Sequence, residues 1–547
     1  MKMHPRQKWL LSAAVALLAA CASCSDEVDP DPDPDPDPQP AKFSLSVSPD
    51  KLPVLQGSSG TFAVTVTRET GFTGAVTLTF SGLPTGASAA GATIASDATK
   101  ADITVTAAGT APHSLPTTVT VTGTSGEATA TKTLTVTVRG PAGSVDTSFG
   151  GGPVLTAVGA SEDYAEAIAV QPDGKIIVVG RTATASGTDF AVLRYARDGS
   201  LDTEFGTGGK VSTSLATGSD EAYAVALQSD GKILVAGSTE QAASGLDFAL
   251  ARYNANGTLD TTFGTGGTVT TAFGNGTDRA FAITVQADGK IVVGGESTVT
   301  GTGQDFALAR YNADGSLDTG FGTGGKVLTA LKADNGKDVI YSLTKQTAGG
   351  ETRIIAAGGD GDFILARYTA NGTLDSSFGT AGKIVGLFGS PTGSARSAAL
   401  TSDGKLVVAG ASNNDFSLVR LSADGALDTG FGTAGKVVTP VSTTDNFDEA
   451  TALALQSDGK LVVAGWVNAG SSSSADFAVL RYEATGALDT GFGTGGKVVT
   501  AVASGTKSDQ ARALALQPDD RVPVTRIVVT GFANESNNEF ALTRYWP

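Results

Sequence analysis

Seven arginines and seven aspartates recur together along this 547-residue sequence. The arginines are Arg194, Arg252, Arg310, Arg367, Arg420, Arg481 and Arg544, and the aspartates are Asp146, Asp202, Asp260, Asp318, Asp375, Asp428 and Asp489. A guanidinium next to a carboxylate makes a charge-assisted hydrogen bond. Because the pair is repeated seven times, we expect a structural role, with each Arg bonded to the Asp and covering a nearby Phe.

One of these turns also resembles part of a calcium loop. Asn312, Asp314, Ser316 and Asp318 alternate as ligands of such a loop do. The bidentate Glu that normally completes the ligand set is absent from the expected place. We therefore favour a hairpin turn over a metal loop here.

A second set of carboxylates lies eight residues before the end of a recurring strand. Its members are Asp163, Asp220, Asp278, Asp338, Asp448 and Asp509, and Gly393 occupies the seventh position. Two interpretations remain open. Six converging carboxylates would suit calcium, which prefers several oxygen ligands. Alternatively, each Asp caps its own turn through backbone amides, which we favour. No other cofactor is expected.

Groups suited to catalysis are scarce. His113 is the single histidine beyond His4, and it is expected to lie in a loop. There is no Ser-His-Asp set, His or Cys metal cluster, or acid pair unique to one repeat. Trp466 is a candidate ligand-binding residue, because it is the one large aromatic residue in its segment that is expected to have no counterpart in the other repeats. It lies at the start of the longest of the variable segments that follow the second strand of each repeat, and it is expected either to stack on a sugar or to pack beneath its Ser-rich loop.

The elements that position these residues form a repeat, shown by "DFALARYNADGSLDTGFGTGGKV" at residues 305–327. Its Phe recurs at intervals of 53 to 61 residues, at Phe149, Phe205, Phe263, Phe321, Phe378, Phe431 and Phe492. One period contains four short apolar segments separated by turns rich in Gly, Asp and Asn. Four strands per period predict a β-propeller blade.

The ends of the repeat array predict how the propeller closes. The chain finishes on a third strand, "EFALTRYWP", and the array begins with a lone fourth strand in "GSVDTSFGGGPVLTAV", residues 143–158. Pairing of the two would complete seven blades over residues 141–547 and leave no open edge. The motif resembles the delta-60 repeat, a bacterial β-propeller family of uncharacterised function. The resemblance implies the fold and no ligand or catalytic residue.

Residues 41–140 form a separate unit. Segments such as "TFAVTVTRE" and "TKTLTVTV" alternate apolar and polar residues, and about seven such strands predict an antiparallel β-sandwich. The unit is similar to the cysteine-free immunoglobulin-like modules of bacterial surface proteins. The fold class is thus all-β, with an Ig-like sandwich preceding a seven-bladed propeller.

The first forty residues indicate export. Lys2, Arg6 and Lys8 precede an apolar run, so residues 1–20 are predicted to be a signal peptide. "LAAC" resembles a bacterial lipobox, which implies cleavage before Cys21, lipidation of Cys21 and, with Ala22 next, transfer to the outer membrane. A plain signal peptide is the alternative. The rest of 21–40, rich in Asp-Pro, is predicted to be a stiff linker.

The net charge of the chain argues against one class of function. The net charge is −17 and the pI about 4.6, which argues against nucleic-acid binding because phosphate contacts require clustered cations. We expect a monomeric, lipid-anchored cell-envelope scaffold that binds or adheres to a protein or polysaccharide. The alternatives are a hydrolase or lyase on the propeller, with or without a metal, and a purely structural envelope protein.

Overall fold

The structure is a computed structural model. It describes residues 42–332, 336–348, 350–389, 392–442, 447–468, 474–503, 508–519, 524–535 and 537–547. The predicted signal peptide, Cys21, Cys24 and the Asp-Pro linker lie outside the described residues. The described part consists of strands and turns, with no helix, so the all-β prediction is confirmed. Within this part there is accordingly no helix long and apolar enough to cross a membrane.

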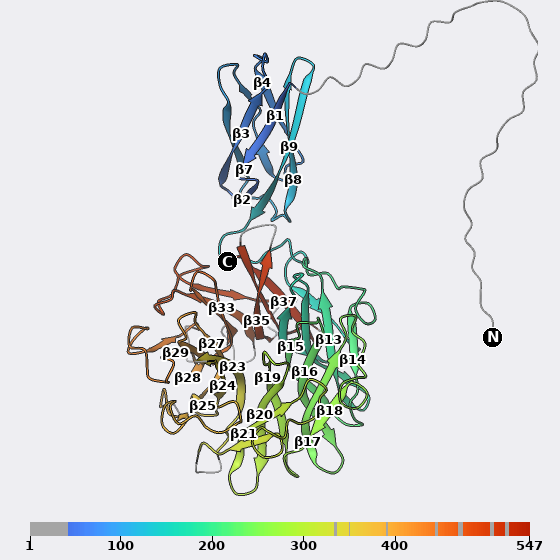
Figure 1. Cartoon of the computed structure of the whole chain (residues 1–547), viewed down its shortest axis with the longest axis vertical. Helices are drawn as coiled ribbons and strands as arrows, with labels where there is room; N and C mark the ends of the chain where they lie inside the picture. The colour runs from blue at the N-terminus through green and yellow to red at the C-terminus, as the bar shows by residue number, and fades with distance from the viewer. Residues whose placement is uncertain are drawn as a thin grey trace, which may run out of the picture.

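The N-terminal unit contains two sheets around one apolar core (Figure 1). One sheet has the order β1-β3-β7-β5 and the other β2-β9-β8-β4-β6, so the structure has nine strands here where the sequence suggested about seven. The strands are β1 (Phe43–Ser48), β2 (Lys51–Leu55), β3 (Ser59–Arg68), β4 (Val76–Ser81), β5 (Ala87–Ala89), β6 (Ala92–Ile94), β7 (Lys100–Ala107), β8 (Thr117–Ser125) and β9 (Ala128–Arg139). The extra strands are short edge segments, β5 and β6, with three residues each.

The remaining strands form four-stranded antiparallel sheets of one design, seven of them in the described residues. The first strands are β11 (Asp163–Val170), β15 (Asp220–Leu227), β19 (Asp278–Val285), β23 (Ile340–Ala348), β27 (Gly393–Leu400), β31 (Asp448–Leu455) and β35 (Asp509–Asp519). The second strands are β12 (Ile176–Thr184), β16 (Ile233–Gln241), β20 (Ile291–Val299), β24 (Glu351–Gly358), β28 (Leu406–Ser412), β32 (Leu461–Asn468) and β36 (Val524–Asn534).

The outer half of each sheet completes the pattern. The third strands are β13 (Gly187–Tyr195), β17 (Gly245–Tyr253), β21 (Gly303–Tyr311), β25 (Ile364–Tyr368), β29 (Asp415–Leu421), β33 (Ala475–Tyr482) and β37 (Asn538–Tyr545). The fourth strands are β14 (Lys210–Thr213), β18 (Thr268–Thr271), β22 (Lys326–Thr329), β26 (Lys383–Ile384), β30 (Lys436–Thr439), β34 (Lys497–Thr500) and β10 (Val154–Thr156).

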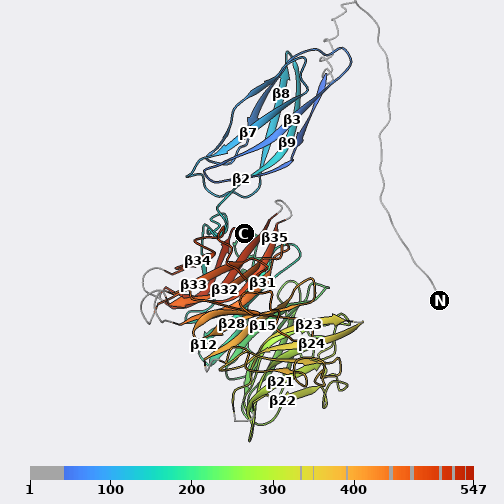
Figure 2. The same cartoon turned by 90° about the vertical axis from the view of Figure 1, so that its left-hand side faces the viewer.

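The first strands surround a common axis. Each contacts the first strand of the following sheet, and β35 contacts β11, so the series returns to its start. The last sheet combines both ends of the array, because β10 pairs with β37 through Val154↔Leu542 and Thr156↔Phe540. Figures 1 and 2 show the sheets as one body, with the β1–β9 unit stacked on it and the C-terminus near the junction.

The core of this body lies between the sheets. Second strands are buried along continuous apolar runs, as in β20, because neighbouring sheets cover both of their faces. Seven apolar clusters result, each shared by two consecutive sheets. One of them joins Val528 of the last sheet to Val178 of the first. The packing is therefore continuous around the axis.

The repeated Arg and Asp form the predicted pair in every sheet. Each Arg Nε lies 2.6 to 2.9 Å from an Asp Oδ2, and its guanidinium lies 4.5 to 4.7 Å from the centroid of the repeated Phe. In the last sheet Arg544 pairs with Asp146 from the other end of the array. The same guanidiniums also reach the next sheet, as when Arg252 Nη1 donates to the Ala313 carbonyl oxygen at 2.5 Å. The structural interpretation of this motif is confirmed.

Candidate functional site

The first strands begin at one mouth of the axial channel, where the second carboxylate set lies. Asp163 and Thr182 are cross-strand neighbours, so the first strands start where the second strands end. The variable segments after the second strands thus lie at the same mouth. The turns after the first and third strands, which are nearly uniform in sequence, lie at the opposite mouth.

Each of the six predicted aspartates accepts hydrogen bonds from amides of the turn before it. The shortest of these bonds run from 2.6 to 2.8 Å and involve Asp163, Asp220, Asp278, Asp338, Asp448 and Asp509. At the seventh position Gly393 has no carboxylate. Asp362, from the turn after the preceding second strand, accepts from the amides of Phe388 and Gly389 at 3.1 Å instead. The seven turns are capped alike.

These contacts match the turn-cap interpretation of the carboxylate set. In the described residues no three or more His, Cys, Asp or Glu side chains are grouped to hold a metal ion. The calcium-like turn has internal bonds of its own: Ser316 donates to Asp314 Oδ1 at 2.6 Å, and Asp318 is paired with Arg310.

Several of these caps face a second carboxylate from the neighbouring sheet. Burial raises the pKa of the Asp220, Asp278 and Asp448 carboxyls, and a nearby Asp on a third strand adds to the effect in each case. Burial likewise raises the pKa of Asp305, next to Asp338. Carboxylate oxygens of both Asp305 and Asp338 are buried without a hydrogen-bond partner among the described residues.

A β-bulge interrupts the first strand of every sheet. The register between first and second strands shifts by one residue at the third position after the capping site. A Gly opposes each bulge. A Cβ on Gly237 would lie 1.9 Å from the Glu221 carbonyl oxygen, and one on Gly295 would lie 1.8 Å from the Arg279 carbonyl oxygen. Only glycine allows the two backbones to approach this closely.

The bulged residues differ from sheet to sheet, unlike the frame around them. We call them the channel belt: Glu166, Tyr223, Phe281, Tyr341, Arg396, Thr451 and Arg512. All seven are half-buried. The sequence interpretation missed them. In six of the seven sheets their sequence signal is a variable residue between two small ones, as in Ala222-Tyr223-Ala224, three residues after the capping position, and Tyr341 differs in following Ile340.

Three consecutive sheets contribute aromatic side chains to the belt. The ring centroids of Tyr223 and Phe281 lie 4.8 Å apart at 54°, and those of Phe281 and Tyr341 lie 5.4 Å apart at 47°. We call these three residues the aromatic arc. The Arg396 guanidinium lies 4.0 Å from the Tyr341 ring centroid and ends the arc with a cation–π contact.

Apart from Thr451, the remaining belt residues are charged, and they lie next to charged residues of neighbouring positions. Arg396 Nε lies 2.6 Å from Glu449 Oε1, and Arg512 Nε lies 3.7 Å from Glu166 Oε2. Arg181 Nη1 lies 3.7 Å from Glu166 and 3.6 Å from Glu221. We call these six residues the polar arc: Arg181, Arg396, Arg512, Glu166, Glu221 and Glu449. It contains three cations and three anions, so its formal charge is zero.

The residues of the two arcs also act on one another electrostatically. Burial raises the pKa of the Glu166 carboxyl, and the guanidiniums of Arg512 and Arg181 oppose that rise. Arg396, four sheets away along the chain, also acts on Glu166. Burial and then Glu221 raise the pKa of the Tyr223 hydroxyl, which also donates a hydrogen bond to Glu221. The two arcs thus meet at Tyr223.

Trp466 lies in strand β32, opposite Glu449, rather than in the loop that follows. Its ring stacks on Phe447 with centroids 5.3 Å apart and an interplanar angle of 19°. The expectation that it has no counterpart was wrong, because Phe532 lies at the equivalent position of the last sheet, opposite Gln510. The equivalence of Trp466 and Phe532 follows from the pairing register between the first and second strands, which the sequence alone does not define.

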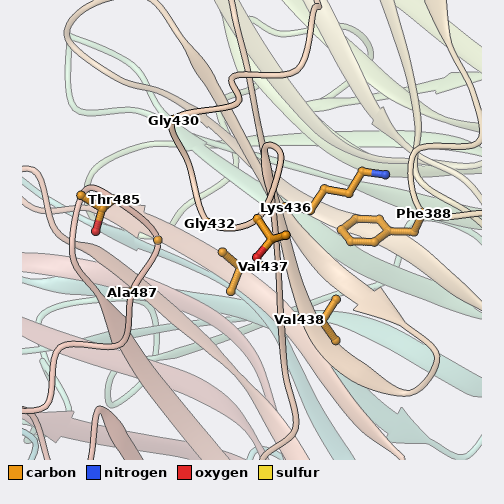
Figure 3. Close-up of a pocket in the computed structure, with 10 residues that line it drawn as sticks. Phe388, Gly430, Gly432, Lys436, Val437, Val438, Thr485 and Ala487 are labelled. Atoms are coloured by element: carbon orange, nitrogen blue, oxygen red, sulfur yellow. The ribbon is translucent and has the colours of Figure 1, made fainter.

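The pocket in Figure 3 lies away from the channel, at the outer rim. It is lined by Phe388, Lys436 and Thr485, among others, and Lys436 belongs to a fourth strand. Equivalent grooves contain Phe273 with Lys326, and Val441 with Lys497. Because this groove recurs between sheets, it belongs to the repeat rather than to a unique site.

Comparison with known proteins identifies the repeat but no activity. Six segments, residues 171–205, 228–263, 286–321, 347–378, 401–431 and 456–492, match a family model described as "Domain of unknown function (DUF5122) beta-propeller". The chain is therefore similar to β-propeller repeat proteins. No curated protein matches it. A crystal structure of a DUF4784 family protein from Bacteroides caccae ATCC 43185 shares 11% identity, with a TM-score of 0.27, over 82% of this chain and 97% of that one.

Proposed function

We propose that this chain is a lipid-anchored bacterial cell-envelope protein that binds a protein or polysaccharide. In this proposal residues 1–20 direct export, Cys21 carries the lipid at the outer membrane, and residues 21–40 act as a spacer. An Ig-like module then holds a seven-bladed propeller of delta-60-type repeats, closed by its N-terminal strand. The chain works as a monomer.

The observation that supports binding is the position of the non-repeated side chains. The Arg–Asp–Phe unit is the same in all seven sheets, so it cannot distinguish one ligand from another. The channel belt varies at every step, and it lies toward the mouth that also has the variable segments. Variable residues on a rigid scaffold are the usual location of a binding site.

The test labels each mouth in turn. Ala243 lies in the turn after β16 at the belt mouth, and Ala313 lies in the turn after β21 at the opposite mouth; both are exposed. Ala243→Cys and Ala313→Cys are made in the full chain in a Cys24→Ser background, and a bulky maleimide is attached. We expect saturable binding to an envelope polysaccharide or protein that is blocked at least tenfold by the label at 243 and unchanged by the label at 313.

Other outcomes separate the alternatives. Binding that the label at 313 blocks would contradict the assignment of the mouth. No binding at all would favour a purely structural envelope protein, and release of shortened products would favour a hydrolase or lyase. A rise in the thermal midpoint with calcium, lost in Asp220→Ala and Asp278→Ala, would assign a metal to the capping carboxylates. We expect no such rise, because backbone amides already bind them.

A further inference from the structure

We propose that the channel belt is a binding site for the end of an uncharged saccharide. In this proposal, which rests on the function proposed above, the aromatic arc contacts the C–H face of a pyranose and the polar arc bonds its hydroxyl groups. The inference comes from the combination of two unlike arcs around one axis, with a donor in the polar arc, Arg512 Nε, that has no hydrogen-bond partner among the described residues.

The aromatic arc supplies an apolar platform. Tyr223, Phe281 and Tyr341 come from three consecutive sheets and are each half-buried, so a ligand in the channel reaches them. Their rings are mutually tilted rather than stacked flat, so together they form a curved surface. The face of an aromatic ring is electronegative and attracts the polarised C–H groups of a sugar.

The polar arc supplies hydrogen bonds without net charge. Its three Arg and three Glu balance, which disfavours phosphate and polyanionic ligands and suits a neutral one. The separations of Arg181 and Arg512 from Glu166 are 3.7 Å, too long for direct hydrogen bonds. Arg512 Nε is buried and has no hydrogen-bond partner among the described residues. A hydroxyl that both donates and accepts would bridge such a pair.

The closed ring of first strands determines how a ligand can enter the site. First strands of all seven sheets surround the axis, so the belt has no open side along which the middle of a polymer could lie. A saccharide therefore enters by its end, with one or a few residues inside the mouth. The site should prefer oligosaccharides and chain termini over internal segments.

The test uses saturation-transfer NMR and calorimetry on the full chain in detergent. The probes are neutral hexoses, N-acetylhexosamines and their oligosaccharides of two to four residues, with uronic acid oligosaccharides as a charged comparison. We expect saturable binding of at least one neutral probe, with saturation transfer to ring C–H protons. Phe281→Ala should weaken it at least tenfold, and Phe281→Tyr should retain it.

A matched control is available at the opposite mouth. Leu427 is 39% exposed in the turn between β29 and β30, so Leu427→Ala removes a comparable apolar side chain and should leave the affinity unchanged. The thermal midpoint of each variant shows whether it is folded, and Arg512→Gln tests the polar arc if Phe281→Ala unfolds.

The inference is overturned if no neutral probe binds, if only uronic acid probes bind, or if binding survives both Phe281→Ala and Arg512→Gln. These failures are distinct from failure of the proposed function. If an envelope ligand still binds, and the label at Ala243→Cys still blocks it, the belt mouth is a binding face whose ligand is not a neutral saccharide.

Discussion

Two repeated aspartate positions differ in how the fold changes the pKa of their carboxyl groups. At the Arg–Asp–Phe unit, the hydrogen bond from Lys290 and the charge of Arg310 hold the pKa of Asp318 below its ordinary value. At the junction between sheets, burial and the nearby Asp338 raise the pKa of Asp305. The first carboxylate stabilises the fold when ionised, whereas ionisation of the second opposes folding.

We predict that Asp318→Asn destabilises the fold at neutral pH by about 3 kcal/mol, because Arg310 remains buried without its counter-charge. The folded pKa of Asp318 lies below the unfolded value of about 3.8. Its contribution is therefore complete above that value and lost as the pH falls through the folded pKa. Thermal unfolding at pH 7 and pH 3 measures the gap between variant and native chain, and a gap that stays constant would contradict the prediction.

Asp305→Asn should behave in the opposite way. The raised folded pKa means that ionisation costs stability as the pH rises through it, and Asn removes this cost while still accepting the bond from Thr302. We expect the thermal midpoint at pH 7 to be equal to or higher than that of the native chain, with the advantage disappearing toward pH 4. A midpoint at pH 7 as low as that of Asp318→Asn would show that Asp305 is stabilising when ionised.

At the scale of the strand, the bulge creates the site. The first strand must approach the second closely enough that only Gly fits opposite, and the extra residue is then directed to the axis. The second strand is buried over its first seven residues, so it cannot move away from the first strand. The bulge position therefore combines a backbone geometry that is repeated in every sheet with a side chain that varies from sheet to sheet.

We predict that Gly237→Ala lowers stability by about 2 kcal/mol, because its Cβ would lie 1.9 Å from the Glu221 carbonyl oxygen. The displaced bulge should also weaken ligand binding through Tyr223. Gly274→Ala is the control, since a Cβ there has no atom within 4 Å and the position has no positive φ. Equal thermal midpoints for the two variants would be inconsistent with the bulge geometry.

The strands and the Arg–Asp pairs were predictable because their signals are local and occur seven times. The belt was not, because a bulge depends on the register between two strands, and alternation alone does not reveal register. The same limit hid the equivalence of Trp466 and Phe532. The cap of the turn before Gly393 could not be predicted for another reason, because the capping carboxylate is that of Asp362, which lies in a different turn.

At the scale of the whole molecule, the two units meet through His113. The Trp546 indole Nε1 donates to His113 Nδ1 at 3.2 Å, and the Thr147 amide donates to the same nitrogen at 3.3 Å. The other charged groups near His113 are Asp146 and Arg526, whose guanidinium lies 3.5 Å from the Trp546 ring centroid. Both bonds require an unprotonated Nδ1. The sequence suggested only a loop histidine here.

We predict that the contact between the units weakens below about pH 6.5. Burial lowers the pKa of His113 from its ordinary 6.5, with Arg526 adding to this and Asp146 opposing it. The joined state is therefore fully stable above 6.5, and stability is lost as the pH falls from there toward the lowered pKa. Small-angle scattering at pH 7.5 and pH 5 should show a broader distribution of dimensions at pH 5. His113→Asn, whose amide oxygen accepts but does not titrate, should show no pH dependence; if the variant responds as the native chain does, His113 is not the cause.

The most direct test of the assignment of scaffold and site is hydrogen exchange with and without a saturating envelope ligand. Mass spectrometry resolves the amides of β19 and β23 from those of the turns at the opposite mouth. We expect ligand-dependent protection in the first strands around the channel belt and in the segments that follow the second strands, with none in the uniform turns. Protection confined to those turns, to the outer rim or to residues 43–139 would contradict the assignment.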